Sequence, residues 1–173
     1  MVRIYLTAFL LLLVTSSVVA QEHKSKPTFS ITINGRVKSP KTFTADAIRQ
    51  YKVYNIGDVV ITNHKGEVKG TAKELSGILL RDLLQSIEPD AESQKVLSEY
   101  YFTCIASDGY KVVFSWNELF NTTTGNTVYI ITSKDHKSID TLDESILLIS
   151  TADIHAGRRY VKNLQSIIVR RAE

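Results

Sequence analysis

Short runs that alternate apolar and polar residues recur along this chain, and they constrain its fold more than any other feature. Residues 29–33 read Phe-Ser-Ile-Thr-Ile, which is the period of a half-buried strand. The Asn34-Gly35 pair that follows indicates a two-residue hairpin with a return strand over 36–38, because both turn positions favour residues that tolerate positive φ. Further apolar or β-branched runs predict strands over 58–62, 100–106, 110–114, 127–132, 146–149 and 166–169, and Asp108-Gly109 predicts a second hairpin.

Three segments carry helical signals instead. Thr44 is suited to cap a short helix over 44–50. Residues 71–87 predict the longest helix, because apolar side chains fall on one stripe at helical spacing. The Ser-x-x-Glu pattern from Ser115 to Glu118 is a capping box that opens a helix reaching residue 120. The chain is therefore expected to be an α+β protein in which strands dominate.

Length, charge and cysteine content exclude several classes of protein. The chain has 173 residues, which fits one domain with a substantial core. A formal net charge of +3, without a long Lys or Arg run, argues against a nucleic-acid-binding protein. The single cysteine, Cys104, rules out an internal disulfide framework, and no Cys/His cluster has zinc-finger spacing.

Residues 1–20 are typical of a secretory signal peptide. Arg3 precedes an almost unbroken apolar run over 4–14, and Val18 and Ala20 occupy the small-residue positions before a cleavage point. A run of about 11 apolar residues is short for a membrane span, so an uncleaved anchor is the weaker alternative. We expect a loose polar arm over 21–28 and one domain over 29–173, exported to the periplasm or secreted, with no membrane attachment after cleavage.

Three ordered segments carry a resemblance to a known family. Residues 77–84 read Gly-Ile-Leu-Leu-Arg-Asp-Leu-Leu, residues 107–110 read Ser-Asp-Gly-Tyr, and residues 157–167 begin Gly-Arg-Arg-Tyr-Val-Lys-Asn-Leu and end in isoleucine. They are similar to the W-x-G-V-x-L-x-D-L-L helix, the D-G-Y hairpin and the G-R-x-V-K-W-L-x-x-I ending of the molybdopterin-binding domain of the sulfite oxidase family. The resemblance covers roughly residues 29–171. It implies curved, mostly antiparallel sheets with packed helices, and a molybdenum–pterin cofactor that serves oxygen-atom or electron transfer.

The chain also departs from that family at its metal ligand. Active members place a molybdenum-ligating cysteine shortly before the W-x-G helix, whereas residues 60–64 here read Val-Ile-Thr-Asn-His. Leu75 stands where the family has tryptophan. A soft metal centre needs its thiolate, so standard molybdenum catalysis is not expected. Cys104 lies in an apolar strand, and we expect it to be buried and to ligate no metal.

The residues that the resemblance assigns to a cofactor lie in three places. In the C-terminal segment, four potentially cationic side chains within eight residues favour an anionic ligand, because Arg offers a forked pair of donors and Gly157 lets a ligand approach the backbone. The alternative to a ligand site is a solvated basic turn in the C-terminal segment and an ordinary turn in the other two places. The candidate cofactor-binding residues are His155, Gly157, Arg158, Arg159 and Lys162, with Asp108, Gly109 and Tyr110 of the hairpin and His64 of the preceding turn.

Three functions therefore stay open. The first is an exported domain that keeps a pterin or other small anionic ligand without molybdenum-thiolate catalysis. The second is an active molybdopterin oxidoreductase with an unusual ligand set, through Cys104 or without any protein thiolate. The third is a scaffold protein that binds a partner and no cofactor. Because fold does not fix function, no catalytic residue and no metal ligand is assigned.

Overall fold

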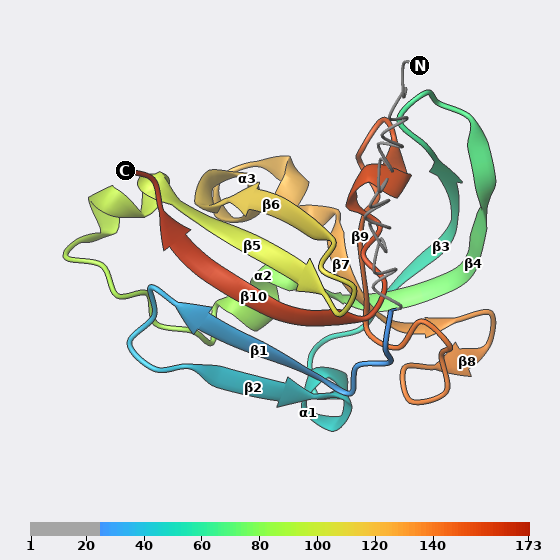
Figure 1. Ribbon diagram of the computed structural model, residues 1–173, viewed down its shortest axis with the longest axis horizontal. Coiled ribbons are helices and arrows are strands. Elements are labelled where there is room, and N and C mark those ends of the chain that lie inside the picture. Colours follow the sequence, from blue (N-terminus) through green and yellow to red (C-terminus); the bar gives the residue numbers. More distant parts are fainter. Residues whose placement is uncertain (1–24) are drawn as a thin grey trace, which may run out of the picture.

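The computed structural model describes residues 25–173, in which two β-sheets lie side by side with three short helices (Figure 1). The predicted signal peptide, residues 1–20, and the first part of the predicted arm, 21–24, fall outside this range. The rest of that arm is held in place rather than loose. The backbone N–H of Lys26 donates to Ser107 Oγ at 2.8 Å, and Asn163 Nδ2 donates to Ser25 Oγ at 2.6 Å.

The first sheet has five strands, and its only parallel pair is formed by the first and last strands of the chain. Its order is β2-β1-β10-β5-β6. The strands are β1 (Ser30–Gly35), β2 (Lys41–Thr44), β5 (Tyr100–Ala106), β6 (Lys111–Ser115) and β10 (Leu164–Arg171).

The second sheet is antiparallel throughout and has the order β3-β4-β7-β8, with β9 also paired to β7. It curves strongly, so that the long β3–β4 hairpin rises beside the last part of the chain (Figure 1). Its strands are β3 (Tyr54–Thr62), β4 (Val68–Leu79), β7 (Val128–Lys134), β8 (Lys137–Ser138) and β9 (Leu147–Ser150).

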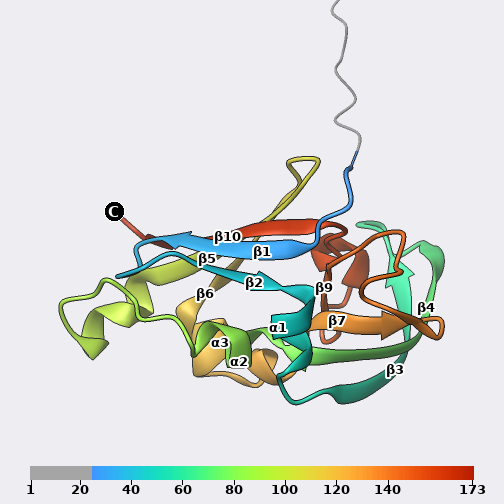
Figure 2. The same cartoon turned by 90° about the horizontal axis from the view of Figure 1, so that it is seen from below.

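The helices cover one face of the first sheet (Figure 2). They are α1 (Ala45–Arg49), α2 (Leu80–Leu84) and α3 (Trp116–Phe120), and the 3-10 turns are η1 (Gln94–Glu99), η2 (Thr123–Asn126) and η3 (Ala156–Arg159). Alternate strand residues such as Ile33, Phe114 and Ile167 meet them in the main core. Apolar side chains of the second sheet form a smaller core centred on Leu75 and Leu147. Among the described residues, no helix is long and apolar enough to cross a membrane.

Several local predictions are confirmed. Strands β5 and β6 form the hairpin that Asp108-Gly109 indicated. Thr44 caps α1, and Ser115 with Glu118 forms the capping box of α3. Cys104 is fully buried in the middle of β5.

The helix predicted over 71–87 is wrong, since its first part is strand β4 and only α2 is α-helical. The strand bulges at Glu74, whose φ is 51°, and the bulge turns both Ala72 and Leu75 toward the interior. Buried residues three positions apart therefore imitate helical spacing within a strand. Residues 77–80 are all buried, and Ile78 and Leu80 belong to the main core.

The hairpin predicted at Asn34-Gly35 is also wrong. Strand β2 does return antiparallel to β1, but it begins only at Lys41, after a longer connection. Gly35 has a φ of 94°, and a Cβ there would clash with the Val169 carbonyl of β10. Arg36 then donates its backbone N–H to that same carbonyl at 2.9 Å. The glycine therefore serves the close approach of β1 to β10 rather than a tight turn.

Candidate functional site

The three segments that carry the candidate cofactor residues meet at one place in the structure. The Tyr110 hydroxyl donates to the Arg158 carbonyl oxygen at 2.6 Å, which ties the β5–β6 hairpin to η3. Gly157 lies against the end of β3, where a Cβ would clash with the Thr62 carbonyl. A Cβ on Gly66 would lie 3.5 Å from His155 Cε1. We call this meeting point, formed by Thr62, the turn 63–67, Tyr110 and residues 155–158, the junction.

The turn 63–67 is built by the side chain of Asn63. Its Oδ1 accepts the backbone N–H groups of Lys65 and Glu67 at 2.9 and 3.1 Å, and its Nδ2 donates to Glu67 Oε2 at 2.7 Å. His64 therefore projects from a well-ordered turn into solvent, where it is exposed.

The hairpin tip is shaped by its own residues in a similar way. Asp108 Oδ1 accepts the Tyr110 backbone N–H at 2.9 Å, and Gly109 has a φ of 87°. Both residues are accounted for by turn geometry. Tyr110 is the member of this group that reaches the junction.

Two buried polar atoms at the junction have no protein partner. Among the described residues, Thr62 Oγ1 and His155 Nδ1 are two of four buried side-chain polar atoms without a hydrogen bond. Arg158 is exposed, and none of the ion pairs within residues 25–173 involves it. The junction therefore offers two unsatisfied buried polar atoms, and Arg158, whose backbone carbonyl lies there, has an exposed guanidinium that can bind an anion.

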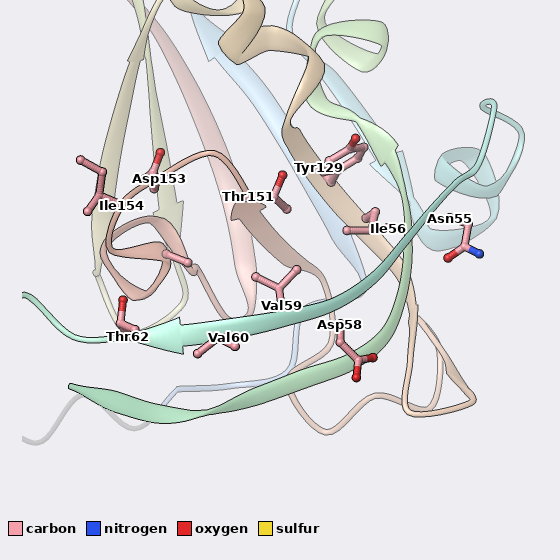
Figure 3. Close-up of a pocket in the computed structure, with 11 residues that line it drawn as sticks. Asn55, Ile56, Asp58, Val59, Val60, Thr62, Tyr129, Thr151, Asp153 and Ile154 are labelled. Atoms are coloured by element: carbon pink, nitrogen blue, oxygen red, sulfur yellow. The ribbon is translucent and has the colours of Figure 1, made fainter. Parts of the chain in front are cut away.

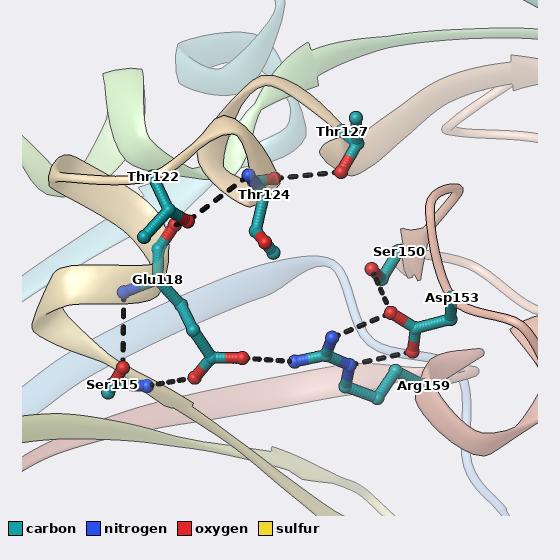
Figure 4. Close-up of polar contacts among 8 residues, drawn as sticks. All are labelled: Ser115, Glu118, Thr122, Thr124, Thr127, Ser150, Asp153 and Arg159. Carbon is teal, nitrogen blue, oxygen red and sulfur yellow. Dashed lines mark hydrogen bonds and ion pairs between the residues drawn. The ribbon is translucent and has the colours of Figure 1, made fainter.

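Arg159 is paired with carboxylates from two parts of the fold, Asp153 and Glu118 (Figure 4). Its Nε and Nη2 donate to the two oxygens of Asp153 at 2.7 and 2.6 Å, and Nη1 donates to Glu118 Oε1 at 3.0 Å. The guanidinium also stacks 4.3 Å from the Phe114 ring centroid. Its charge is thus balanced inside the protein.

The carboxyl groups around Arg159 are held in their charged form. Burial alone would raise the pKa of Asp153, but hydrogen bonds from Arg159 and Ser150 outweigh it and hold the pKa below its ordinary value. The pKa of Glu118 is lowered in the same way: burial opposes ionisation, while Ser115 and Arg159 favour it more strongly.

Lys162 also has an internal partner. Its Nζ lies 2.8 Å from Glu144 Oε1, while Lys134 Nζ donates to the other oxygen of Glu144 at 2.6 Å. These groups and Tyr160 line a small cavity of about 330 Å³, together with Ile61 of β3 and residues 69–72 of β4. The four cationic candidates of the C-terminal segment therefore point in different directions, and their mutual repulsion needs no bound anion to relieve it.

A larger cavity of about 530 Å³, which the sequence did not indicate, runs beside β3 (Figure 3). Its walls are β3 and the segment 151–156, and Tyr129 of β7 contributes to its lining. Thr62 belongs both to this cavity and to the junction. The one sequence signal at this place is Ile154, an isolated apolar residue in a polar segment, and it is 91% exposed.

A thiolate-bound molybdenum centre does not fit these residues. Cys104 is enclosed by β10 and β6 within the first sheet, and burial raises its pKa to about 12. Strand β3 ends in Thr62, which has no thiol. Within residues 25–173, no group of three or more His, Cys, Asp or Glu side chains is placed to hold a metal ion.

One solved structure with low sequence identity supports the fold. No protein-family model matches the chain, and no curated protein sequence matches it. The crystal structure of the sulfane dehydrogenase SoxCD from Paracoccus pantotrophus is similar, with a TM-score of 0.58 at 12% sequence identity. The match covers 82% of this chain but only 38% of that protein. At this identity the likeness shows the fold alone, and it agrees with the α+β architecture that the sequence predicted.

Proposed function

We propose that this protein is a binding domain, with a fold related to the sulfite oxidase family, that takes a small anionic ligand of the pterin phosphate kind at the junction. The observation that carries the proposal is the meeting of three sequence-distant segments there. The family resemblance had assigned each of them to a cofactor, and they now share direct contacts through Tyr110, Gly157 and Thr62.

The junction has groups that suit such a ligand. Arg158 presents a forked pair of donors, which matches a phosphate or carboxylate. Thr62 Oγ1 and His155 Nδ1 can each form a hydrogen bond that the protein itself leaves unmade. The missing Cβ of Gly157 keeps η3 close enough to β3 for these groups to act together.

The two other functions have less support. An active molybdenum oxidoreductase would need a ligand that the described residues do not place, because Cys104 is buried and protonated. A cofactor-free scaffold would leave the unpartnered atoms at the junction without a role. Metal analysis of protein made in a cofactor-producing host separates the first of these functions from ours, since we expect no stoichiometric molybdenum.

Calorimetric titration with a pterin monophosphate, and with inorganic phosphate, tests the proposal directly. We expect saturable binding of the pterin monophosphate. Replacing Arg158 with alanine should weaken it by about tenfold to a hundredfold, because a charge-assisted hydrogen bond contributes about 1.5–3 kcal/mol. Raised salt should also weaken binding, since an exposed site is screened.

Arg170→Ala is the matched control, because Arg170 is an exposed arginine on β10 that is absent from the ion pairs of the described chain. Its affinity should equal that of the wild type. Equal affinity in the wild type and Arg158→Ala, or no binding by either protein, would refute the anion site and favour the scaffold function.

A further inference from the structure

The cavity of about 330 Å³ beside β4 carries more positive than negative charge. Its lining includes Lys69, Lys134 and Lys162, whereas Glu144 is the one carboxylate among the lining residues. Lys69 has a partner of its own outside the lining, because its Nζ lies 3.2 Å from Glu67 Oε2. The other two lysines both pair with Glu144, and within residues 25–173 it is the one carboxylate that pairs with either of them.

The two lysines occupy both oxygens of that carboxylate. Lys134 Nζ donates to Glu144 Oε2 at 2.6 Å, and Lys162 Nζ lies 2.8 Å from Oε1. The side chains of Lys134 and Glu144 are only 16% and 22% exposed, so solvent screens their charges less than it screens those of a surface pair. Two ammonium groups and one carboxylate leave one positive charge at the cavity.

The protonation states of these groups do not remove the excess charge. Burial alone would lower the pKa of Lys134, but its interactions with Glu144 and Tyr160 outweigh burial and hold the pKa above its ordinary value. Burial likewise opposes ionisation of Glu144, whereas hydrogen bonds from Lys134 and Lys162 lower its pKa by more. Lys134 and Glu144 are therefore both charged at neutral pH.

Tyr160 does not supply the missing negative charge. Burial raises the pKa of its phenol, and the nearby Glu144 carboxylate raises it further, so the hydroxyl keeps its proton. A protonated phenol is instead a hydrogen-bond donor. The cavity thus presents an unbalanced ammonium charge together with a hydroxyl donor, and both kinds of group bind an anionic oxygen.

Apolar walls accompany these polar groups. Ala72 is buried in the smaller core of the second sheet, Ile61 and Tyr160 pack against that core, and all three line the cavity. A ligand that fills the cavity therefore contacts apolar atoms as well as charge. Such a lining suits an organic anion with a compact apolar body better than a hydrated inorganic ion.

We propose that this cavity is a second ligand site, which binds a small monocarboxylate beside Lys134, Lys162 and Tyr160. The ligand carboxylate accepts hydrogen bonds from the ammonium groups and the phenol, and its single negative charge balances the excess positive charge. The site is separate from the junction and from the larger cavity beside β3, because it shares no residue with either.

Titration of the purified protein with benzoate, followed by NMR in a buffer of low chloride content, tests the proposal. We expect saturable shifts of the Ala72 methyl and Tyr160 ring resonances, since both residues line the cavity. Benzamide is the matched ligand control, because it has nearly the same shape without the charge. It should bind about tenfold more weakly than benzoate, or worse.

Two substitutions should change the benzoate affinity in opposite directions. Lys134→Met leaves a balanced pair of Lys162 and Glu144, so benzoate should bind about tenfold more weakly. Glu144→Gln keeps the size of the side chain but removes the competing carboxylate, so benzoate should bind about threefold more tightly, or better. Lys162→Met should weaken binding as Lys134→Met does, and it provides the same test at a more exposed lysine if Lys134→Met does not fold.

Lys137→Met is the matched control variant. Lys137 pairs with Lys134 across the β7–β8 hairpin and has Asp143 as its own partner at 3.5 Å. Its replacement should leave the benzoate affinity unchanged. Circular dichroism checks that each variant is folded.

Any of five results would overturn the proposal: no saturable binding of benzoate, equal binding of benzamide, equal affinities in Lys134→Met and Lys137→Met, weaker binding in folded Glu144→Gln, or shifts confined to Tyr110 and Gly157 at the junction. Because the two sites share no residue, their failures are distinguishable. A protein that binds pterin monophosphate but not benzoate would refute this proposal alone, and the reverse result would refute the proposed function alone.

Discussion

At the scale of single residues, two adjacent arginines have opposite surroundings. The side chain of Arg159 is 21% exposed and bonded to two carboxylates, whereas Arg158 is exposed and outside the ion pairs of residues 25–173. The sequence assigned both to the same ligand site, because nothing local distinguishes them. The distinction depends on Glu118, which lies 41 positions earlier in the chain.

Arg159→Leu should destabilise the protein by about 2–3 kcal/mol, because Asp153 and Glu118 would remain partly buried without their cation. Urea unfolding at pH 7 measures this loss. Arg158→Ala should change the free energy of unfolding by no more than about 0.5 kcal/mol. Equal losses in the two variants would contradict the structural role of Arg159.

Arg159→Leu should also be less sensitive to acid than the wild type. The pKa values of Asp153 and Glu118 are lowered in the folded protein, so their contribution to stability is present above the unfolded pKa values and is lost as pH falls through the folded ones. The free energy of unfolding of the wild type should therefore decrease once the pH is below about 4, and it should approach that of Arg159→Leu. A constant difference between the two proteins from pH 7 down to pH 2 would contradict this.

At the scale of elements, the sequence predicted strands and caps well and the longest helix badly. Caps and the Asp-Gly hairpin depend on neighbouring residues, which the sequence displays directly. Strand β4 depends on a bulge at Glu74 and on the packing of Ile78 in the main core against residues distant in the sequence. Neither cause is visible within the segment, so apolar spacing alone favoured the wrong element.

A substitution that destabilises a strand but stabilises a helix tests whether this segment is a strand. Thr71→Ala, at an exposed β4 position opposite Val60, should destabilise the protein by about 0.5–1 kcal/mol, because alanine is poor in strands. In a helix the same change would stabilise by about 0.5 kcal/mol. Asn117→Ala in α3 is the comparison, where we expect the helical sign. Denaturant midpoints at constant slope measure both changes.

At the scale of the whole molecule, the candidate site could be predicted only as a set of segments. The motifs assigned residues 64, 108–110 and 155–162 to one site, whereas the junction brings together Tyr110 with His155, Gly157 and Arg158, and Arg159 and Lys162 are paired elsewhere. The cavity beside β3 escaped prediction because its two walls, around Val60 and Ile154, lie more than 90 positions apart in the chain. No local pattern reports that two such segments face each other.

The predicted export signal lies outside the described residues. We propose that residues 1–20 are removed between Ala20 and Gln21, because Val18 and Ala20 fit the cleavage pattern. Expression of the full chain in a secreting host, followed by intact-mass measurement of the exported protein, should give the mass of residues 21–173. Retention of Met1 in the exported protein would contradict cleavage.

The position of Cys104 has a consequence for how the motions of this protein can be followed. It is the one thiol of the chain, and strands β10 and β6 flank it within the main core. A thiol reagent can reach it only when those strands separate, so labelling reports the opening of the first sheet and nothing at the surface. When reclosing is fast, the labelling rate divided by that of a free thiol is the fraction of time the sheet spends open. The unaltered protein thus allows its rare open state to be counted without an added probe.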